Sequence, residues 1–374
     1  MNDQTKKVRT YHLLDVEITT EPNREIRQHL GSMIQGTPGG VTYRSVTSNT
    51  KFDVLGETYF LTLKKSNRLL GTICLVHKVL DYEGSKVSAW YLRYFHIKAP
   101  MRKDTGKQRK PERENTSASR ILLSSVDQYL TNPETLLPEE KRSNRSLLFG
   151  FIIEDNLRSA RWGDTIEILP YGQLKLFVFT RFRPKKDARV EQVSAGDITD
   201  MKEKLKEFYS GYSLYCDQNL FFGDYYYVIR HNNEIVAGMQ ANPEQWEIFH
   251  KPGVSGFIVH KVLTRLPYLR RIINLKAFRF AAVEGIYYKP GYEHLLSPLM
   301  EAICARYSVN FMFCYLDNQS PVMATLNHHV KKGLISQLIE TEASDIRIKF
   351  YNWDKEEEQK FTGKPFYISC LDST

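Results

Sequence analysis

The sequence predicts an α/β fold of the α+β kind, with a mixed sheet in each domain. Two similar domains follow one another along the chain. The 374 residues, of which 42% are hydrophobic and 25% charged, suffice for two domains with their own cores. Strand-like and helix-like stretches alternate, and the same order of elements occurs twice. A charged run after Pro184 and a new helix start at Asp197–Asp200 separate the two copies. We therefore place the domains at residues 1–190 and 191–374.

Each copy has an early β-hairpin, and a strongly apolar strand comes later. The hairpins fall within Tyr59–Val76 and Tyr226–Asn242, where two short strand patterns flank a polar turn. The apolar strands are Ala89–Ile97 and Ala277–Tyr288, and continuous apolar character is typical of a strand buried on both faces.

A helix and a further strand complete each copy. Helical spacing predicts helices at Ser117–Leu130 and His294–Tyr307, and Pro298 should kink the second or mark its first turn. The segments Leu147–Ser159 and Asn310–Ser320 each contain a short buried strand that ends in Asp-Asn. The shared order favours duplication over two unrelated α/β domains. It matches neither a solenoid nor a dinucleotide-binding fold, which would begin with its phosphate turn.

The positive charge of the chain lies in its first half. Residues 1–190 carry 32 Lys and Arg against 21 Asp and Glu, whereas residues 191–374 carry 20 against 22, so the net charges are +11 and −2. Much of the excess lies in Ile97–Arg113, which either binds an anionic partner or forms a solvated loop. This run contains no aromatic residue, which argues against nucleic acid as the partner.

Cysteine usage and hydropathy indicate a cytoplasmic protein with reduced thiols. The five cysteines are dispersed without a Cys-x-x-Cys pair, and no constellation of metal-ligand residues stands out. The polar amino terminus lacks the apolar core of a signal peptide, and no apolar run approaches the ~18 residues of a membrane span. We expect no metal and no transmembrane segment, and the sequence gives no oligomeric state.

The order of elements resembles the GNAT (Gcn5-related N-acetyltransferase) superfamily, and the chain looks like a tandem GNAT protein. In the second half, VEGIYYKPGYEHLLSPLMEA from Val283 looks like the strand, turn and helix of that family, and CYLDNQSPV from Cys314 like its next strand. In the first half, YFHIKAPMRKDTG and FIIEDNLRSARWG take the same places. The resemblance implies that acetyl-CoA or another acyl-CoA lays its pantetheine arm on the splayed central strand and its pyrophosphate at the following turn.

The resemblance also implies which residues bind the acyl-CoA. The family's pyrophosphate motif has Arg or Gln, two residues, Gly, one residue, then Gly or Ala, and neither half matches it in full. Glu293 would place a negative charge near the two phosphates, and Tyr287 and Tyr288 are expected to line the acceptor pocket. The implied cofactor-binding residues are Ile286, Tyr287, Gly291, Tyr292, His294 and Asn318 in the second half, and Arg102, Gly106 and Asn156 in the first.

Acyl transfer to an amine needs a group that accepts the amine proton and a proton for the leaving thiolate. By resemblance to aminoglycoside-type acetyltransferases, Glu284 on the second central strand orients the amine or takes its proton. The alternative is a carboxylate that faces solvent or pairs with an arginine. His96 is its first-half counterpart, or else a half-buried histidine bonded to backbone. Many GNAT enzymes have an acid tyrosine about seven residues after the Asn, where this chain has Gly163 and Thr325.

We predict an N-acyltransferase, in the first instance an N-acetyltransferase, that transfers an acyl group from acyl-CoA to the amine of a small molecule or peptide. The second half is expected to be catalytic through Glu284, with the first half supporting it. Two alternatives stay open. One is a catalytically degenerate tandem fold that binds a ligand or partner, which the missing pyrophosphate motif favours. The other is an acyl or aminoacyl transferase that acts on lipid, peptide or aminoacyl-tRNA.

Overall fold

The computed structural model describes residues 5–11, 14–36, 41–66, 68–97, 126–250, 274–333, 335–338 and 343–373. The chain forms two compact units, each assembled from separate stretches of sequence. Unit 1 comprises Met1–Leu30, Leu55–Gly150 and Ile348–Trp353; unit 2 comprises Gly31–Val54, Phe151–Arg347 and Asp354–Thr374. Residue 190 itself lies inside unit 2, and the boundary placed there between the two sequence copies stays a prediction.

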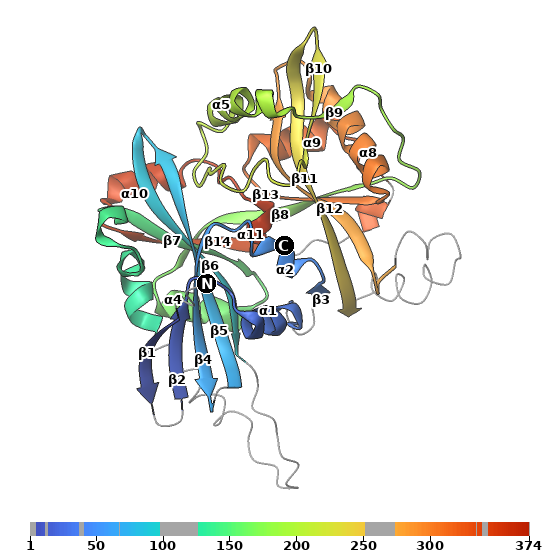
Figure 1. Ribbon diagram of the computed structural model, residues 1–374. Helices are drawn as coiled ribbons and strands as arrows, with labels where there is room; N and C mark the ends of the chain where they lie inside the picture. The colour runs from blue at the N-terminus through green and yellow to red at the C-terminus, as the bar shows by residue number, and fades with distance from the viewer. Residues whose placement is uncertain are drawn as a thin grey trace. The chain divides into compact units, whose positions relative to one another are not determined.

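The sheet of unit 1 has the strand order β1-β2-β4-β5-β6-β7. All neighbours are antiparallel except β6 and β7, which are parallel. Ser66, with φ +47°, lies in the turn between β4 and β5, and this confirms the predicted first hairpin. The strands are β1 (Lys6–Tyr11), β2 (Leu14–Thr19), β4 (Glu57–Lys65), β5 (Arg68–Tyr82), β6 (Ser85–Ile97) and β7 (Ser146–Ile153), whose last three residues belong to unit 2 (Figure 1).

Helical segments of unit 1 are short. The predicted helix Ser117–Leu130 enters the described part of the chain only at its end, where residues 126–131 are helical and Val126 and Leu130 are buried. The other helical segments are α1 (Arg24–Gly31), η1 (Pro133–Leu136) and η2 (Glu139–Lys141). Helix α1 buries Ile26 and Leu30, which are four residues apart and share one face.

The sheet of unit 2 has the strand order β8-β13-β12-β11-β10-β9, and β3 pairs with β11. The second predicted hairpin is confirmed as β10 and β11, whose turn residues Asn232 and Asn233 both have positive φ. Strand β11 is longer than expected and continues through Pro243. The strands are β3 (Thr42–Ser45), β8 (Leu169–Thr180), β9 (Val190–Gln192), β10 (Tyr226–His231), β11 (Glu234–His250), β12 (Phe278–Tyr288) and β13 (Phe311–Asp317); β14 (Ser344–Tyr351) contributes Ser344–Arg347.

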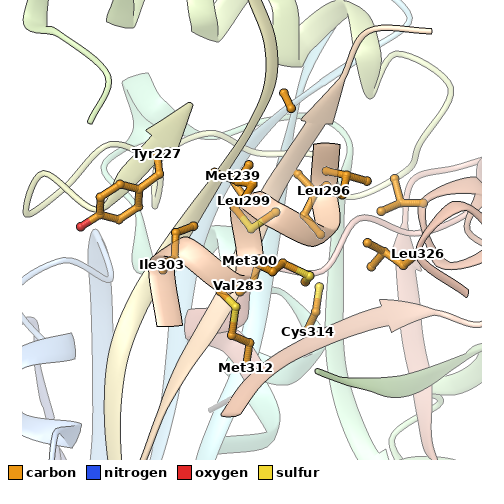
Figure 2. Close-up of a cluster of buried hydrophobic side chains, with 14 of the residues drawn as sticks. Tyr227, Met239, Val283, Leu296, Leu299, Met300, Ile303, Met312, Cys314 and Leu326 are labelled. Carbon is orange, nitrogen blue, oxygen red and sulfur yellow. The ribbon is translucent and has the colours of Figure 1, made fainter. Parts of the chain in front are cut away.

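Helix α8 (Leu296–Tyr307) covers one face of this sheet. Figure 2 shows Leu299 and Ile303 of α8 in a buried cluster with side chains of β11, β12 and β13, among them Met239, Val283 and Met312. Each fully buried aliphatic side chain contributes about 1.5–3 kcal/mol, so this face anchors β12. The predicted helix is confirmed, and Pro298 lies in its first turn, where a proline costs no hydrogen bond.

The remaining helices of unit 2 include α9, which begins directly after the Asp-Asn turn of β13. Ser320 caps it, because its hydroxyl accepts a hydrogen bond from Val322 N–H (3.2 Å). Helix α10 begins with a capping box in which Asp354 and Glu357 each bond the other's backbone N–H. The helices are α2 (Ser48–Lys51), α4 (Leu157–Thr165), α5 (Ile198–Phe208), α9 (Pro321–His329), α10 (Lys355–Thr362) and α11 (Cys370–Ser373), with short helical turns η3 (Ala195–Asp197), η6 (Glu293–Leu295) and η7 (Ile335–Leu338).

Candidate functional site

The central strand of each copy separates from its parallel neighbour. In unit 2, β12 pairs with β13 only at Ala281↔Met312 and Ala282↔Phe313, although both strands continue beyond this point. In unit 1, the last parallel pair between β6 and β7 is Tyr91↔Phe149, and β6 continues for six more residues. Beyond the last pair, each strand has backbone groups that the parallel neighbour does not bond.

A β-bulge follows the point of separation in both strands. Tyr94 in β6 has φ +53° and Gly285 in β12 has φ +57°, each three residues after the last parallel pair. The antiparallel partners shift register at the same places, between Thr72 and Cys74 and between Gly238 and Gln240. The two copies therefore share a bulged, splayed central strand, in agreement with the duplication that the sequence predicts.

Side chains of unit 2 bond the backbone of the bulge. Tyr226 donates its hydroxyl hydrogen to Gly285 O (2.9 Å), and Tyr209 donates to Ile286 O (2.6 Å). A Cβ on Gly285 would lie 3.0 Å from Leu220 Cδ2, in a backbone region that L side chains rarely adopt. The predicted cofactor residue Ile286 is itself buried, and its carbonyl oxygen is already bonded.

The bulges assign equivalent residues, and these differ from the sequence expectation. Glu284 precedes Gly285, and the residue that precedes Tyr94 is Arg93, so Arg93 and not His96 is the counterpart of Glu284. The guanidinium of Arg93, which is 8% exposed, lies over the Tyr94 ring at 4.1 Å. His96 lies three residues further along, and its Nδ1 is 3.1 Å from Nε2 of His29.

Glu284 is buried at 3% exposure, so it does not face solvent. Its Oε1 accepts hydrogen bonds from Asn242 Nδ2 (3.2 Å) and from the thiol of Cys370 (3.0 Å). Burial, and then the negative charge of Glu284, raise the pKa of Cys370 well above the usual value for a thiol. The carboxylate thus has an amide and a thiol as partners, which neither alternative of the sequence analysis anticipated.

The turn after β12 uses its own backbone donors. Gly291, with φ +89°, donates its N–H to Glu293 Oε1 (3.1 Å). Hydrogen bonds from the backbone of Glu293 itself and of Gly291 lower the pKa of the Glu293 carboxyl. Lys289, in the same turn, forms an ion pair with Glu234 (2.6 Å). An ionised carboxylate therefore accepts the hydrogen bond of the Gly291 N–H, which lies in the turn where the GNAT resemblance implies a phosphate.

Two other predicted residues lie close to this turn. The ring of Tyr292 packs against His231, with centroids 5.6 Å apart, and His294 is exposed on the short helical turn η6. Tyr287 is half-buried and packs edge-on against Phe208 of α5.

A tyrosine stands beside the position that the resemblance assigns to the catalytic acid. Tyr288 Oη lies 2.8 Å from the hydroxyl of Thr325, the residue seven positions after Asn318. Burial is the main cause that raises the pKa of Tyr288, so the phenol stays protonated at neutral pH. The sequence analysis took Tyr288 only for a pocket wall, because the two residues are remote in the sequence.

The two Asn turns differ in what they bond. The side chain of Asn156 caps α4 and accepts from Ser159 N–H at 3.1 Å. Asn318 is exposed, and its backbone N–H donates to Gln173 O (2.8 Å). The preceding Asp317 bonds the backbone N–H of Phe366, which ties the turn to the C-terminal segment of unit 2.

Several sequence predictions fall partly or wholly outside the described residues. Arg102 and Gly106 lie in the undescribed residues 98–125, so their roles stay predictions. Within the described ranges, no group of three or more His, Cys, Asp or Glu residues could hold a metal ion. All five cysteines are buried, and none of them forms a disulfide. No helix of the described part of the chain is long and apolar enough to cross a membrane.

Solved structures with the same fold decide the architecture. N-myristoyltransferase from Saccharomyces cerevisiae, with bound myristoyl-CoA and inhibitors, aligns with a TM-score of 0.58 at 8% identity, covering 93% of this chain and 82% of the yeast chain. A second structure of that enzyme, with bound myristoyl-CoA, gives a TM-score of 0.56 at 8% identity and covers 98% and 92% of the two chains. The chain has the tandem GNAT fold.

The tandem GNAT fold was predicted from the order of elements alone. No protein-family model matches the sequence, and no curated protein matches it in sequence. At 8% identity the likeness to the yeast enzyme concerns the backbone. The side chains around the two bulges therefore decide what this tandem GNAT fold does.

Proposed function

We propose that this chain is an acyl-CoA-dependent N-acyltransferase that acylates the amine of a small molecule or peptide. The observation that carries the proposal is the bulged central strand that separates from its parallel neighbour, present in both copies. The same fold binds myristoyl-CoA in the yeast structures. The proposal covers acetyl-CoA and longer acyl-CoAs, and it takes the protein to be cytoplasmic.

The separated strands offer a place for an extended thioester arm. Two parallel strands that part leave backbone N–H and C=O groups free to bond the amides of a pantetheine chain, as an added strand would. In unit 2 the carbonyls of Gly285 and Ile286 already bond tyrosines, so the remaining groups of β12 and β13 would serve the arm.

The chemistry assigned to unit 2 uses two side chains. The amine nitrogen attacks the thioester carbon, the C–S bond breaks, and the amine proton passes to Glu284, directly or through water. Tyr288 protonates the departing thiolate, since its raised pKa keeps a proton available. Both groups are on β12, on either side of the bulge at Gly285.

The two halves differ in what they offer to donor phosphates, and we propose that the first half binds them if CoA binds only one half. In unit 2 the ionised Glu293 would repel a pyrophosphate at the turn after β12. The first half instead carries Arg102, Lys103 and Gly106 after its central strand, in the basic run of the sequence. A cluster of cations would bind a pyrophosphate with an affinity that falls as ionic strength rises.

A second function, ligand binding without turnover, is favoured by the same turn. Glu293 closes the site where the second copy would hold a donor, as expected of a degenerate domain. Calorimetric titration with acetyl-CoA, longer acyl-CoAs and free CoA comes first, and assays of thiol release with a panel of primary amines follow. Binding with turnover of at least one amine supports the transferase. Absence of turnover, with or without CoA binding, contradicts the transferase and supports the second function, a degenerate fold that binds a ligand or partner.

A further inference from the structure

Glu284 lies at the end of a buried chain of hydrogen-bonded polar side chains. The proposed chemistry uses Glu284 but none of the other side chains of this chain. Gln240 and Asn242 project from the same face of β11, and Cys370 begins α11 near the C-terminus. All four side chains belong to unit 2 and are at most 3% exposed. Polar groups buried to this degree must satisfy one another, so the direction of each hydrogen bond can be derived.

The backbone N–H of Phe221 fixes the direction of the first hydrogen bond in this chain. Its N–H can only donate, and it donates to Oε1 of Gln240 (2.6 Å), which fixes that atom as the carbonyl oxygen. Nε2 of Gln240 therefore faces Oδ1 of Asn242 (3.2 Å). Asn242 must then turn its own Nδ2 toward Glu284 Oε1 (3.2 Å). The backbone thus sets the orientation of an amide donor two side chains away.

Cys370 approaches the carboxylate as a second donor. Asn242 Nδ2 also donates to Cys370 Sγ (2.9 Å), so the thiol hydrogen does not point at the amide. Its acceptors are Glu284 Oε1 at 3.0 Å and Ala282 O at 3.8 Å, and the nearer, charged carboxylate oxygen is the stronger acceptor. Burial and the Glu284 charge raise the pKa of this thiol well above its usual value, so the sulfur keeps the hydrogen that it donates. One carboxylate oxygen therefore accepts two hydrogen bonds of fixed direction.

We propose that Asn242 and Cys370 are positioning residues for Glu284, which hold its carboxylate in one orientation and favour its charged form. Hydrogen bonds to a carboxylate stabilise the charged state, and a fixed orientation is what a proton acceptor needs to meet an amine. The kinetic role rests on the proposed function, whereas the hydrogen bond itself can be tested without turnover. The C-terminal residues of the chain thereby take part in the site on β12.

The kinetic test compares three cysteine variants. Cys370→Ala removes the donor, Cys370→Ser keeps a donor, and Cys304→Ser changes a buried cysteine of α8 that lies in the separate core against the other face. We expect Cys370→Ala to lower kcat by about 10- to 100-fold with little change in KM and to move the acidic limb of the pH–rate profile to higher pH. Cys370→Ser should recover most of the rate, and Cys304→Ser should match the wild type.

A wild-type rate and pH profile in Cys370→Ala, or a serine variant as impaired as the alanine variant, would overturn the proposal. The S–H stretching band in the infrared gives a readout without turnover. The band that disappears in Cys370→Ala should shift to higher frequency in Glu284→Gln, because a neutral amide is the weaker acceptor, while the Cys304 band stays in place. A Cys370 band that does not move also overturns the inference. If the wild type acylates no amine, the proposed function and the kinetic role fail together, and the band still decides the hydrogen bond.

Discussion

Strands β6 and β12 share one backbone arrangement and carry opposite charges at the equivalent position. Both separate from a parallel neighbour, both bulge three residues later, and both shift the register of their antiparallel partner. The residue before the bulge is the buried Arg93 in β6 and the buried Glu284 in β12. A buried cation suits an anion or a developing oxyanion, whereas a buried carboxylate suits an amine. The two copies thus share the backbone arrangement and differ in the side chains that it carries.

The sequence segments that follow the two strands differ in the same sense. After β12, Glu293 bonds the N–H of Gly291 and brings a negative charge to the turn. After β6 comes the basic run of Ile97–Arg113. The two copies of the GNAT fold are therefore not interchangeable, and a substitution in one copy tests each difference between them.

The largest effect is expected from Glu284→Gln. This variant keeps the size of the side chain and its hydrogen bond with Asn242 but cannot accept the amine proton. The rate should fall by roughly 10²–10⁴-fold with donor affinity unchanged, as measured by thiol release and calorimetry. Thermal unfolding serves as the control. Full activity of the variant on any accepted amine would end the role of Glu284, and a lowered melting temperature with full activity would indicate a structural group.

Tyr288→Phe removes the phenol beside Thr325 and should lower kcat by about 10- to 100-fold. In the wild type, the raised pKa of Tyr288 should keep the phenol protonated, so activity should persist at alkaline pH and decline only where the phenol ionises. The phenylalanine variant should lack this alkaline decline. The matched control Thr325→Val keeps the phenol and should retain most of the rate. Equal rates for wild type and Tyr288→Phe would remove the tyrosine from the mechanism.

Gly285→Ala should destabilise the bulge of β12. The added Cβ meets Leu220 at 3.0 Å and forces a non-glycine residue to φ +57°. We expect a loss of about 1–3 kcal/mol in the free energy of unfolding, measured by urea denaturation. Gly211→Ala is the control, since its Cβ meets nothing within 4 Å and its φ is ordinary. Equal free energies of unfolding for the two variants would show that a side chain at position 285 does not strain the bulge of unit 2.

The smallest effect concerns the pH dependence at Glu293. Its pKa is lowered in the folded protein, so its contribution to stability is present above the unfolded pKa, about 4.3, and is lost as the pH falls through the folded value. Glu293→Gln should lower the free energy of unfolding at pH 7 by a few tenths of a kcal/mol, because solvent screens the turn. Below the folded pKa of Glu293 the two proteins should unfold at the same temperature. If the stability difference between wild type and Glu293→Gln is the same at both pH values, it does not come from the ionised carboxylate of Glu293.

Sequence pattern predicted the hairpins, the central strands and helix α8, since turn residues and hydrophobic periodicity are local signals. It did not predict the bulges, because a tyrosine at φ +53° such as Tyr94 adopts that angle only through pairing with strands elsewhere in the unit. Without the bulges, His96 was matched to Glu284 instead of Arg93. Nor did it predict that Gln240 and Asn242 are buried, because alternating polar residues on a strand ordinarily face solvent.

The role of Tyr288 was missed for a related reason. Its hydroxyl meets Thr325 only because β12 and α9 converge, and 37 residues separate the two positions in the sequence. Cys370 could not be connected to Glu284 from the sequence either, since the two residues are 86 positions apart. Local pattern identifies the strand that carries a site, whereas the partners of each side chain depend on contacts that are remote along the chain.

Calorimetric titration of three proteins with an acyl-CoA, at low and high salt, tests most directly whether the copies differ as proposed. The wild type should bind, with an affinity that falls as salt increases. Arg102→Ala with Lys103→Ala should weaken binding by about 10-fold or more at low salt and reduce the salt dependence. Glu293→Ala should bind as the wild type does, because the donor phosphates are assigned to the other copy. Unchanged affinity in the double variant, or absence of binding in the wild type, would contradict the account.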